Sequence, residues 1–174
     1  MVAILEMGEA VMSNLRIVRG DITQIPADAI VNAANPGLLG GGGVDGAIHR
    51  AAGPELDVAC RRLNGCPTGE AKVTPAFRLP ATIIIHTPGP IWRDGSFEEP
   101  KLLRSCYVNS LKRAVENGCQ TVLFPSISTG VYGYPLGLAA PIAIQAIQTF
   151  PANLDVRMVC FDDVTYQAYQ AQMD

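Results

Sequence analysis

A run of four glycines between an asparagine and an aspartate is the part of the sequence best suited to chemistry. Residues 40–43 lie between Asn35 and Asp45, after an apolar strand-like run and before a helix-like run. Glycine has no Cβ, so the N–H groups of such a loop can approach a ligand closely. The helix that follows adds unpaired amides and the positive end of its dipole, which favour phosphate. We therefore predict a phosphate-binding loop with polar side chains beside it.

A second loop of this kind covers residues 125–134 (PSISTGVYGY). It follows an apolar run and precedes a helical pattern. Its candidate amide donors to phosphate are Ser128, Thr129, Gly130 and Val131, and Tyr132 is a candidate to stack on a sugar. Two such loops in one small domain predict a diphosphate that is bound from both sides.

Several polar or aromatic residues near predicted strand ends have two interpretations. Asp21 in GDIT either accepts a hydrogen bond from an adenine amino group or forms a helix capping box with Gln24. Asn35, which precedes Pro36-Gly37, either forms a turn or binds a ribose hydroxyl. Asp45 either takes part in chemistry or only stabilises a helix N-terminus. Phe161 either lies against a base or packs in the core.

The histidines and cysteines do not suggest a metal site. His86 at a strand end is expected to be a structural hydrogen-bonding residue, and His49 to lie on a packed or solvated helix face. Neither has partners at metal-ligand spacing, so we expect no metal. The five cysteines form no C-x-x-C pair and are odd in number. They predict reduced, buried thiols and a cytoplasmic protein.

Length and charge predict one domain that acts on a small ligand. The chain has 174 residues and a formal net charge of −3, with Lys and Arg scattered along it. This argues against a nucleic-acid surface, and no apolar run approaches the ~18 residues of a membrane span. The first residues lack the features of a signal peptide. We predict that residues 1–13 are an extension without ordered structure or the result of a misplaced start codon, and that residues 14–174 form the domain.

Short strands alternate with helices along the chain, which predicts an α/β sheet with helices on both faces. Several strand candidates are apolar without alternation, as expected for strands that are buried on both sides. The strand candidates are 15–19, 29–33, 71–74, 82–86, 121–125 and 156–161. The helix candidates are 45–63, 98–117 with Gly118 as a C-cap, 136–150 and 164–173.

Two other nucleotide-binding motifs fit the glycine run poorly. Gly41, Gly43 and Gly46 satisfy G-x-G-x-x-G, the fingerprint of dinucleotide-dependent dehydrogenases. The glycines lie too far from the strand, however, and Cys66 stands near the position where the fingerprint has an acidic residue. The sequence has no G-K-[ST], which excludes a P-loop nucleotidase.

Six blocks of the sequence resemble, in their order and spacing, those of a macrodomain of the MacroD type. They are GDIT, NAAN, GGGGVDGAIHRAAG, CPTGEA, HTPGP and PSISTGVYGYP. The resemblance runs from about Leu15 to the C-terminus. It implies a three-layer α/β/α domain around a mixed, mostly parallel sheet, which binds ADP-ribose without a cofactor. It further implies that Asp21, Ile22 and Phe161 contact the adenine. The diphosphate would bind to Gly42, Gly43, Val44, Ser128, Thr129, Gly130 and Val131, and the distal ribose to Asn35, Asp45 and Tyr132.

The resemblance, together with the chemistry of these residues, predicts a hydrolase of labile ribose esters. Its substrates would be proteins with mono-ADP-ribose on acidic side chains and O-acetyl-ADP-ribose, with Asp45 and Asn35 as catalytic residues. A carboxylate leaving group has an ordinary pKa of about 4 and needs little protonation, so one base is enough. The sequence does not distinguish water attack at the anomeric carbon from water attack at the ester carbonyl. The alternative is a reader that binds ADP-ribose without cleaving it. We expect a monomer.

Overall fold

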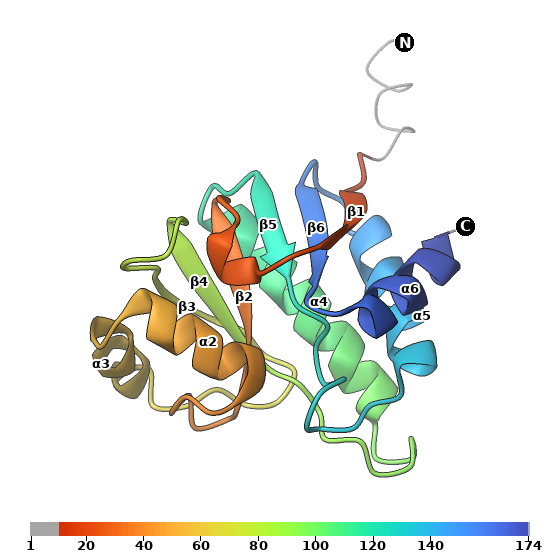
Figure 1. The fold of residues 1–174 in the computed structure, drawn as a ribbon, viewed down its shortest axis with the longest axis horizontal. Coiled ribbons are helices and arrows are strands. Elements are labelled where there is room, and N and C mark those ends of the chain that lie inside the picture. The colour runs from red at the N-terminus through yellow and green to blue at the C-terminus, as the bar shows by residue number, and fades with distance from the viewer. Residues whose placement is uncertain (1–10, 174) are drawn as a thin grey trace.

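The computed structural model describes residues 11–173, so most of the predicted extension, residues 1–10, lies outside the described residues, as does Asp174. Within the described residues, six strands and five α-helices follow one another along the chain (Figure 1). The strands are β1 (Asn14–Arg19), β2 (Ala29–Ala34), β3 (Lys72–Pro75), β4 (Ile83–Pro88), β5 (Thr121–Phe124) and β6 (Asp155–Cys160). The helices are η1 (Ile22–Gln24, 3-10), α2 (Gly43–Ala52), α3 (Glu55–Arg62), α4 (Glu99–Glu116), α5 (Leu136–Gln148) and α6 (Asp163–Met173).

The strands form one sheet in the order β1-β6-β5-β2-β4-β3. All neighbouring strands are parallel except β3, which pairs antiparallel with β4 at one edge. The predicted mixed, mostly parallel sheet is therefore confirmed. Because the strands from β1 to β4 are parallel, their carboxyl ends meet at the same edge, where open α/β sheets bind their ligands.

Two hydrophobic clusters, one on each face of the sheet, make the three layers (Figure 1). On one face, α4, α5 and α6 pack on alternate residues of the central strands, such as Val31 and Phe124. On the other face, α2 and α3 pack on the residues between them, such as Ile30 and Leu123. This explains why these strands are apolar without alternation. All five cysteines are free and buried, as predicted. No described helix is long and apolar enough to span a membrane.

The prediction of one helix over residues 45–63 is wrong in one respect. The segment forms two helices, α2 and α3, with a break at Gly53 and Pro54. Gly53 adopts φ +96° and Pro54 follows it. Proline disfavours the helical conformation of the residue before it and has no N–H to donate, so one continuous helix cannot pass this point. Gly118 follows α4 with φ +70°, as predicted for a C-cap glycine. Its N–H donates to Val115 O and that of Cys119 to Ala114 O, which is a Schellman motif.

Two buried tyrosines connect the helices on one face to the loop after β5. The Tyr107 hydroxyl on α4 accepts a hydrogen bond from Ile127 N at 3.0 Å and lies 3.5 Å from Pro125 O. Tyr169 on α6 is hydrogen-bonded to Ser126 Oγ at 2.9 Å. Burial raises the pKa of Tyr107 well above its ordinary value, so the hydroxyl keeps its proton and can donate as well as accept. The loop therefore has fixed supports beneath it.

We expect Tyr107→Phe to lower the free energy of unfolding by about 1 to 3 kcal/mol, because it leaves the buried Ile127 N–H without an acceptor. Urea denaturation measures this loss. Tyr166→Phe is the matched control, since the Tyr166 hydroxyl contacts only the Gln170 side chain on its own helix. Equal losses in the two variants would show that the hydroxyl of Tyr107 does not support the loop.

Candidate active site

A cleft of about 640 Å³ lies at the carboxyl ends of the parallel strands, within the usual size of a small-ligand site. All the predicted site residues line it, although they come from five separate segments. They are Asp21, Ile22, Asn35, Gly42, Gly43, Val44, Asp45, Ser128, Thr129, Gly130, Val131, Tyr132 and Phe161. The tertiary structure thus brings together every residue that the sequence singled out for this site.

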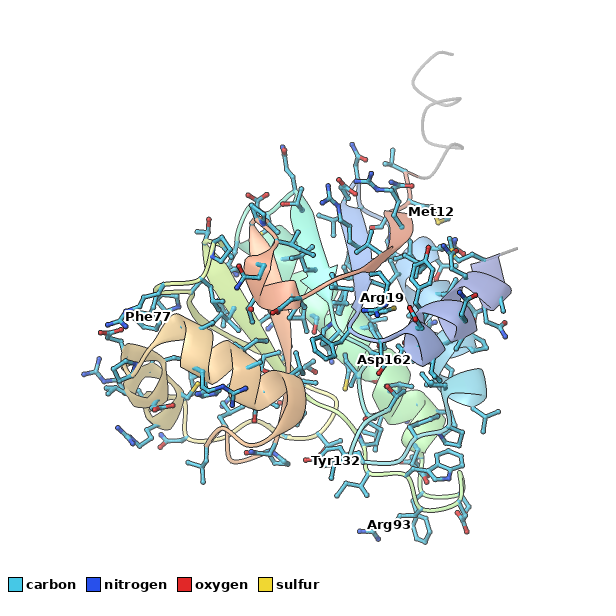
Figure 2. All side chains as sticks on the ribbon, in the orientation of Figure 1. Met12, Arg19, Phe77, Arg93, Tyr132 and Asp162 are labelled. Atoms are coloured by element: carbon cyan, nitrogen blue, oxygen red, sulfur yellow. The ribbon has the colours of Figure 1, made fainter. Side chains whose placement is uncertain are left out.

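The order of the strands gives the cleft two different ends. Asp21 follows β1 and Phe161 follows β6, so these two residues mark one end. The loop after β5 and the glycine loop after β2 lie in the middle, and Gly89 follows β4 at the other end. Figure 2 shows Asp162 beside the first end, and Tyr132 further along the same side of the molecule.

The glycine loop is held close to the start of α2. A Cβ on Gly46 would overlap the carbonyl oxygen of Gly41, so only glycine allows this approach. Gly42 is the N-cap and has no side chain to satisfy the first amides of the helix. Gly43 has φ +58°. The free amides at this helix N-terminus line the cleft, which suits an anionic ligand.

The loop after β5 provides a second set of free amides. Within residues 11–173, the N–H groups of residues 129–132 donate to no partner. Ser128 has φ +67°, a left-handed conformation that is uncommon for a residue with a side chain. The hydroxyl of Thr129 donates to Ser126, which contacts Tyr169 in turn. The two loops follow neighbouring strands, β2 and β5, so their free amides belong to one part of the cleft.

Asp45 is buried, with 6% of its surface exposed, and its carboxylate is held by two side chains. Asn32 Nδ2 donates to Asp45 Oδ1 at 2.8 Å. His49 Nε2 lies 3.3 Å from the same oxygen, within ion-pair distance. Burial raises the pKa of Asp45 above its ordinary value, although the Asn32 hydrogen bond and His49 act in the opposite direction. A base of this kind binds a proton more readily than an exposed aspartate.

Asp45 and Asn35 both lie beside Gly41 of the glycine loop. A Cβ built on Gly41 would lie 3.4 Å from Asp45 Oδ2 and 3.7 Å from Asn35 Nδ2. Asn35 Nδ2 donates to Gly40 O and Asn35 Oδ1 accepts from Leu39 N, both at 3.3 Å, which orients the amide. The carboxylate and the amide therefore line the same part of the cleft.

Asn32 is oriented by a hydrogen-bonded chain that runs behind the cleft. Its second amide hydrogen points to His86 Nδ1 at 3.1 Å, and His86 Nε2 lies 2.9 Å from Thr74 Oγ1. Burial lowers the pKa of His86 to about 3, so the ring is neutral, accepts at Nδ1 and donates at Nε2. His86 thus has the structural role expected of it. Its effect is to fix the amide that holds Asp45.

Sequence analysis missed the role of His49. Its Nδ1 lies 2.7 Å from Asp57 Oδ1 on α3, so His49 bridges two carboxylates instead of lying on an ordinary packed face. The spacing of Asp45 and His49 is i, i+4, which places both on one face of a helix and could have indicated the pair. Asp57 could not have been found in this way, because the break between α2 and α3 decides where it lies.

Asp21 caps a helix through Thr23 and also lines the cleft. Its Oδ1 accepts from Thr23 N at 2.9 Å and from Thr23 Oγ1 at 2.7 Å, which caps η1. The residue is exposed and also lines the cleft. Phe161 is 77% exposed, so the alternative that it packs in the core is wrong. The chain turns away after Cys160, and the side chain lies at the mouth of the cleft.

Comparison with known proteins agrees with this architecture. The family model described as Macro domain matches residues 31–143. The chain belongs to the Macro domain family. A Macro domain-containing protein of Lactiplantibacillus plantarum is 56% identical to it over 167 residues, which cover 93% of this chain and 97% of the relative. A Citrobacter rodentium protein named O-acetyl-ADP-ribose deacetylase is 54% identical over 166 residues, which cover 91% and 94%.

Solved macrodomains have the same fold. A variant of the Oceanobacillus iheyensis macrodomain with ADPR superposes with a TM-score of 0.88 and is 46% identical in sequence. The match covers 95% of this chain and 94% of that one. The predicted resemblance and the predicted three-layer fold are both confirmed.

Among the lining residues of this macrodomain that were not predicted are Arg50, Asp162 and Thr165. Arg50 is on α2, on the glycine-loop side, and within residues 11–173 it is the one Lys or Arg in the lining. Asp162 Oδ1 accepts from Thr165 N at the start of α6. Asp162 follows β6 and could have been selected with Phe161, whereas nothing in the local sequence marks Arg50 or Thr165. Among residues 11–173, no group of three or more His, Cys, Asp or Glu side chains is placed to hold a metal ion.

We expect Asp45→Asn to stabilise the macrodomain at pH 7. A carboxyl whose pKa is raised on folding binds its proton more tightly in the folded state, so its ionisation destabilises the fold as the pH rises. Asparagine removes the charge and can still accept from Asn32. The urea midpoint of Asp45→Asn should be higher than that of the wild-type protein at pH 7, and the two midpoints should converge near pH 4. Asp57→Asn is the control, since it removes an exposed charge beside the same histidine. No gain at pH 7 would contradict this account of Asp45.

Proposed function

We propose that the protein hydrolyses esters of ADP-ribose, namely O-acetyl-ADP-ribose and mono-ADP-ribose on acidic side chains of proteins. The observation that carries the proposal is the buried carboxylate of Asp45, which lies in a cleft lined by free amides and has Asn35 on the other side of Gly41. The names of several relatives, such as the Citrobacter rodentium O-acetyl-ADP-ribose deacetylase, support it. A protein that only binds ADP-ribose has no need of a buried carboxylate beside the distal ribose.

The two ends of the cleft suit the two ends of ADP-ribose. At the β1 and β6 end, Asp21 can accept from the adenine amino group and Phe161 can lie against the ring. In the middle, the amides at the start of α2 and in the loop after β5 would bind the diphosphate. The distal ribose then reaches Asn35, Asp45 and Tyr132, where the chemistry takes place. The reacting ester would then lie away from the adenine, on the side of the cleft toward Gly89.

Hydrolysis of such an ester consumes one water and releases an acid and ADP-ribose. Asp45 Oδ2 would take a proton from the attacking water, while Asn32 and His49 hold Oδ1. The raised pKa of Asp45 makes it a better base than an exposed aspartate, provided that it stays ionised at the working pH. Asn35 would bind a ribose hydroxyl, and the amide-bound diphosphate would fix the distance between water and ester.

Asp45→Ala should lower the turnover rate roughly 10²- to 10⁴-fold, the usual effect of losing a general base. Asn35→Ala should also slow cleavage, because the ribose is then misplaced. Affinity for ADP-ribose should change little in either variant, since the diphosphate binds to backbone. Single-turnover release of acetate from O-acetyl-ADP-ribose and of ADP-ribose from a glutamate-modified protein measures the rate, and calorimetry measures the affinity.

The same measurements distinguish the enzyme from a reader. A wild-type protein that binds ADP-ribose tightly and releases no product from either substrate would be a reader. If Asp45→Ala kept the full rate, the protein would be a hydrolase in which Asp45 only stabilises the start of α2. If only O-acetyl-ADP-ribose or only the glutamate-modified protein were hydrolysed, the result would show whether the ester must carry an acetyl group or a protein side chain.

Asp21→Ala should weaken binding of ADP-ribose by about 1 to 3 kcal/mol, through the loss of a charge-assisted hydrogen bond to the adenine. Because Asp21 also caps η1, the alanine variant alone cannot separate the two effects. Asp21→Asn keeps a cap acceptor for Thr23 but removes the charge. If calorimetry gave wild-type affinity for the asparagine variant and weaker binding for the alanine variant, the residue would act through the cap and not through its charge.

A further inference from the structure

A second, smaller cavity continues the cleft beyond the distal end. It has a volume of about 290 Å³ and shares Gly89 and Tyr132 with the main cleft. Its other walls include Pro36, which follows Asn35 directly, and the chain between β4 and α4. We call it the β4-α4 groove. The hydrogen bond from Trp92 N to Tyr132 O, 2.9 Å long, joins this chain segment to the loop after β5 and fixes the wall between the two cavities.

The groove adjoins the place proposed for the distal ribose. Its walls include Gly89 and Tyr132, which also line the main cleft, and Pro36, which follows Asn35. A group esterified to the distal ribose would therefore have the groove within reach. Figure 2 shows Tyr132 below Asp162 in the view, and Arg93 below Tyr132.

The walls of the groove are mainly apolar. Ile91 and Phe97 are 53% and 55% exposed there, and the Arg93 guanidinium lies over the Phe97 ring, 5.4 Å from its centre. The carboxylate in the wall, Glu99, accepts hydrogen bonds from the amides of residues 93–95 and 97. It therefore has its own partners, and the groove presents hydrocarbon surface to a ligand. A polypeptide segment would find few partners here for its amides and carbonyls.

We propose that the β4-α4 groove binds the acyl chain of the substrate, so that esters of ADP-ribose with aliphatic acids longer than acetate are its preferred small substrates. This rests on the proposed ester hydrolysis and adds the class of acid. Each methylene that is fully removed from water raises a binding or rate constant roughly fourfold. In an open groove we expect about half of that free energy, which corresponds to about a twofold increase for each methylene. Only the chain past the second carbon enters the groove, so the acetyl ester gains nothing from it.

The test compares kcat/KM for O-acetyl- and O-hexanoyl-ADP-ribose in steady state. The hexanoyl ester should be hydrolysed about tenfold more efficiently by the wild-type protein. Ile91→Ser and Phe97→Ser should each reduce this preference severalfold and leave the acetyl rate within about twofold. Val115→Ser is the matched control, because Val115 is similarly exposed but lies at the far end of α4.

The outcomes separate this inference from the function on which it rests. Hydrolysis of the acetyl ester with no preference for the hexanoyl ester would overturn the inference alone. No hydrolysis of either ester would overturn both. If Ile91→Ser slowed only the cleavage of a glutamate-modified protein, the groove would bind the polypeptide and not an acyl chain. The wild-type comparison decides the question even if a variant does not fold.

Discussion

The hydrogen bond between Asn32 on β2 and Asp45 on α2 is the interaction on which the arrangement of the site depends. It is 2.8 Å long, entirely buried, and joins the end of a central strand to the first turn of the helix that follows. The glycine loop must close between these two points. Its free amides therefore line the cleft, and the second oxygen of Asp45 lies beside Gly41. Without this bond a buried carboxylate would have lost a partner that offsets its desolvation.

Several features near the cleft are unfavourable for stability and are supported by hydrogen bonds from residues beneath them. Asp45 is charged and buried, Ser128 has a left-handed backbone conformation, and the amides of residues 129–132 have no protein partner. Beneath them, Tyr107 and Tyr169 bond to the loop after β5, and His86 fixes Asn32. Strain and unsatisfied groups of this kind are found at functional sites, where a ligand supplies the missing partner.

The parallel sheet also determines which loops line the cleft. Each parallel strand ends at the same edge and delivers one loop to it, so the loops after β1, β6, β5, β2 and β4 lie along that edge. The β4-α4 groove adjoins the cleft at Gly89 and Tyr132. Its apolar wall belongs to a loop that Glu99 organises through backbone amides, separately from the glycine loop and the loop after β5. In the proposed substrate complex, the group esterified to the ribose would therefore be recognised separately from the nucleotide.

The sequence by itself determined the alternation of strands and helices, the burial of the strands on both faces, and the glycine loop between Asn35 and Asp45. These features are local, since they depend on apolar runs and on residues close together in the chain. The break at Gly53 and Pro54 is local as well, although the prediction of one helix over residues 45–63 overlooked it. Only the tertiary structure decided that Asp57 reaches His49 and that Phe161 is exposed. It alone placed Arg50 in the cleft and Ile91 and Phe97 beside its distal end. The reason is physical: contacts between distant segments are set by the order of strands in the sheet and by helix packing, which no local pattern records.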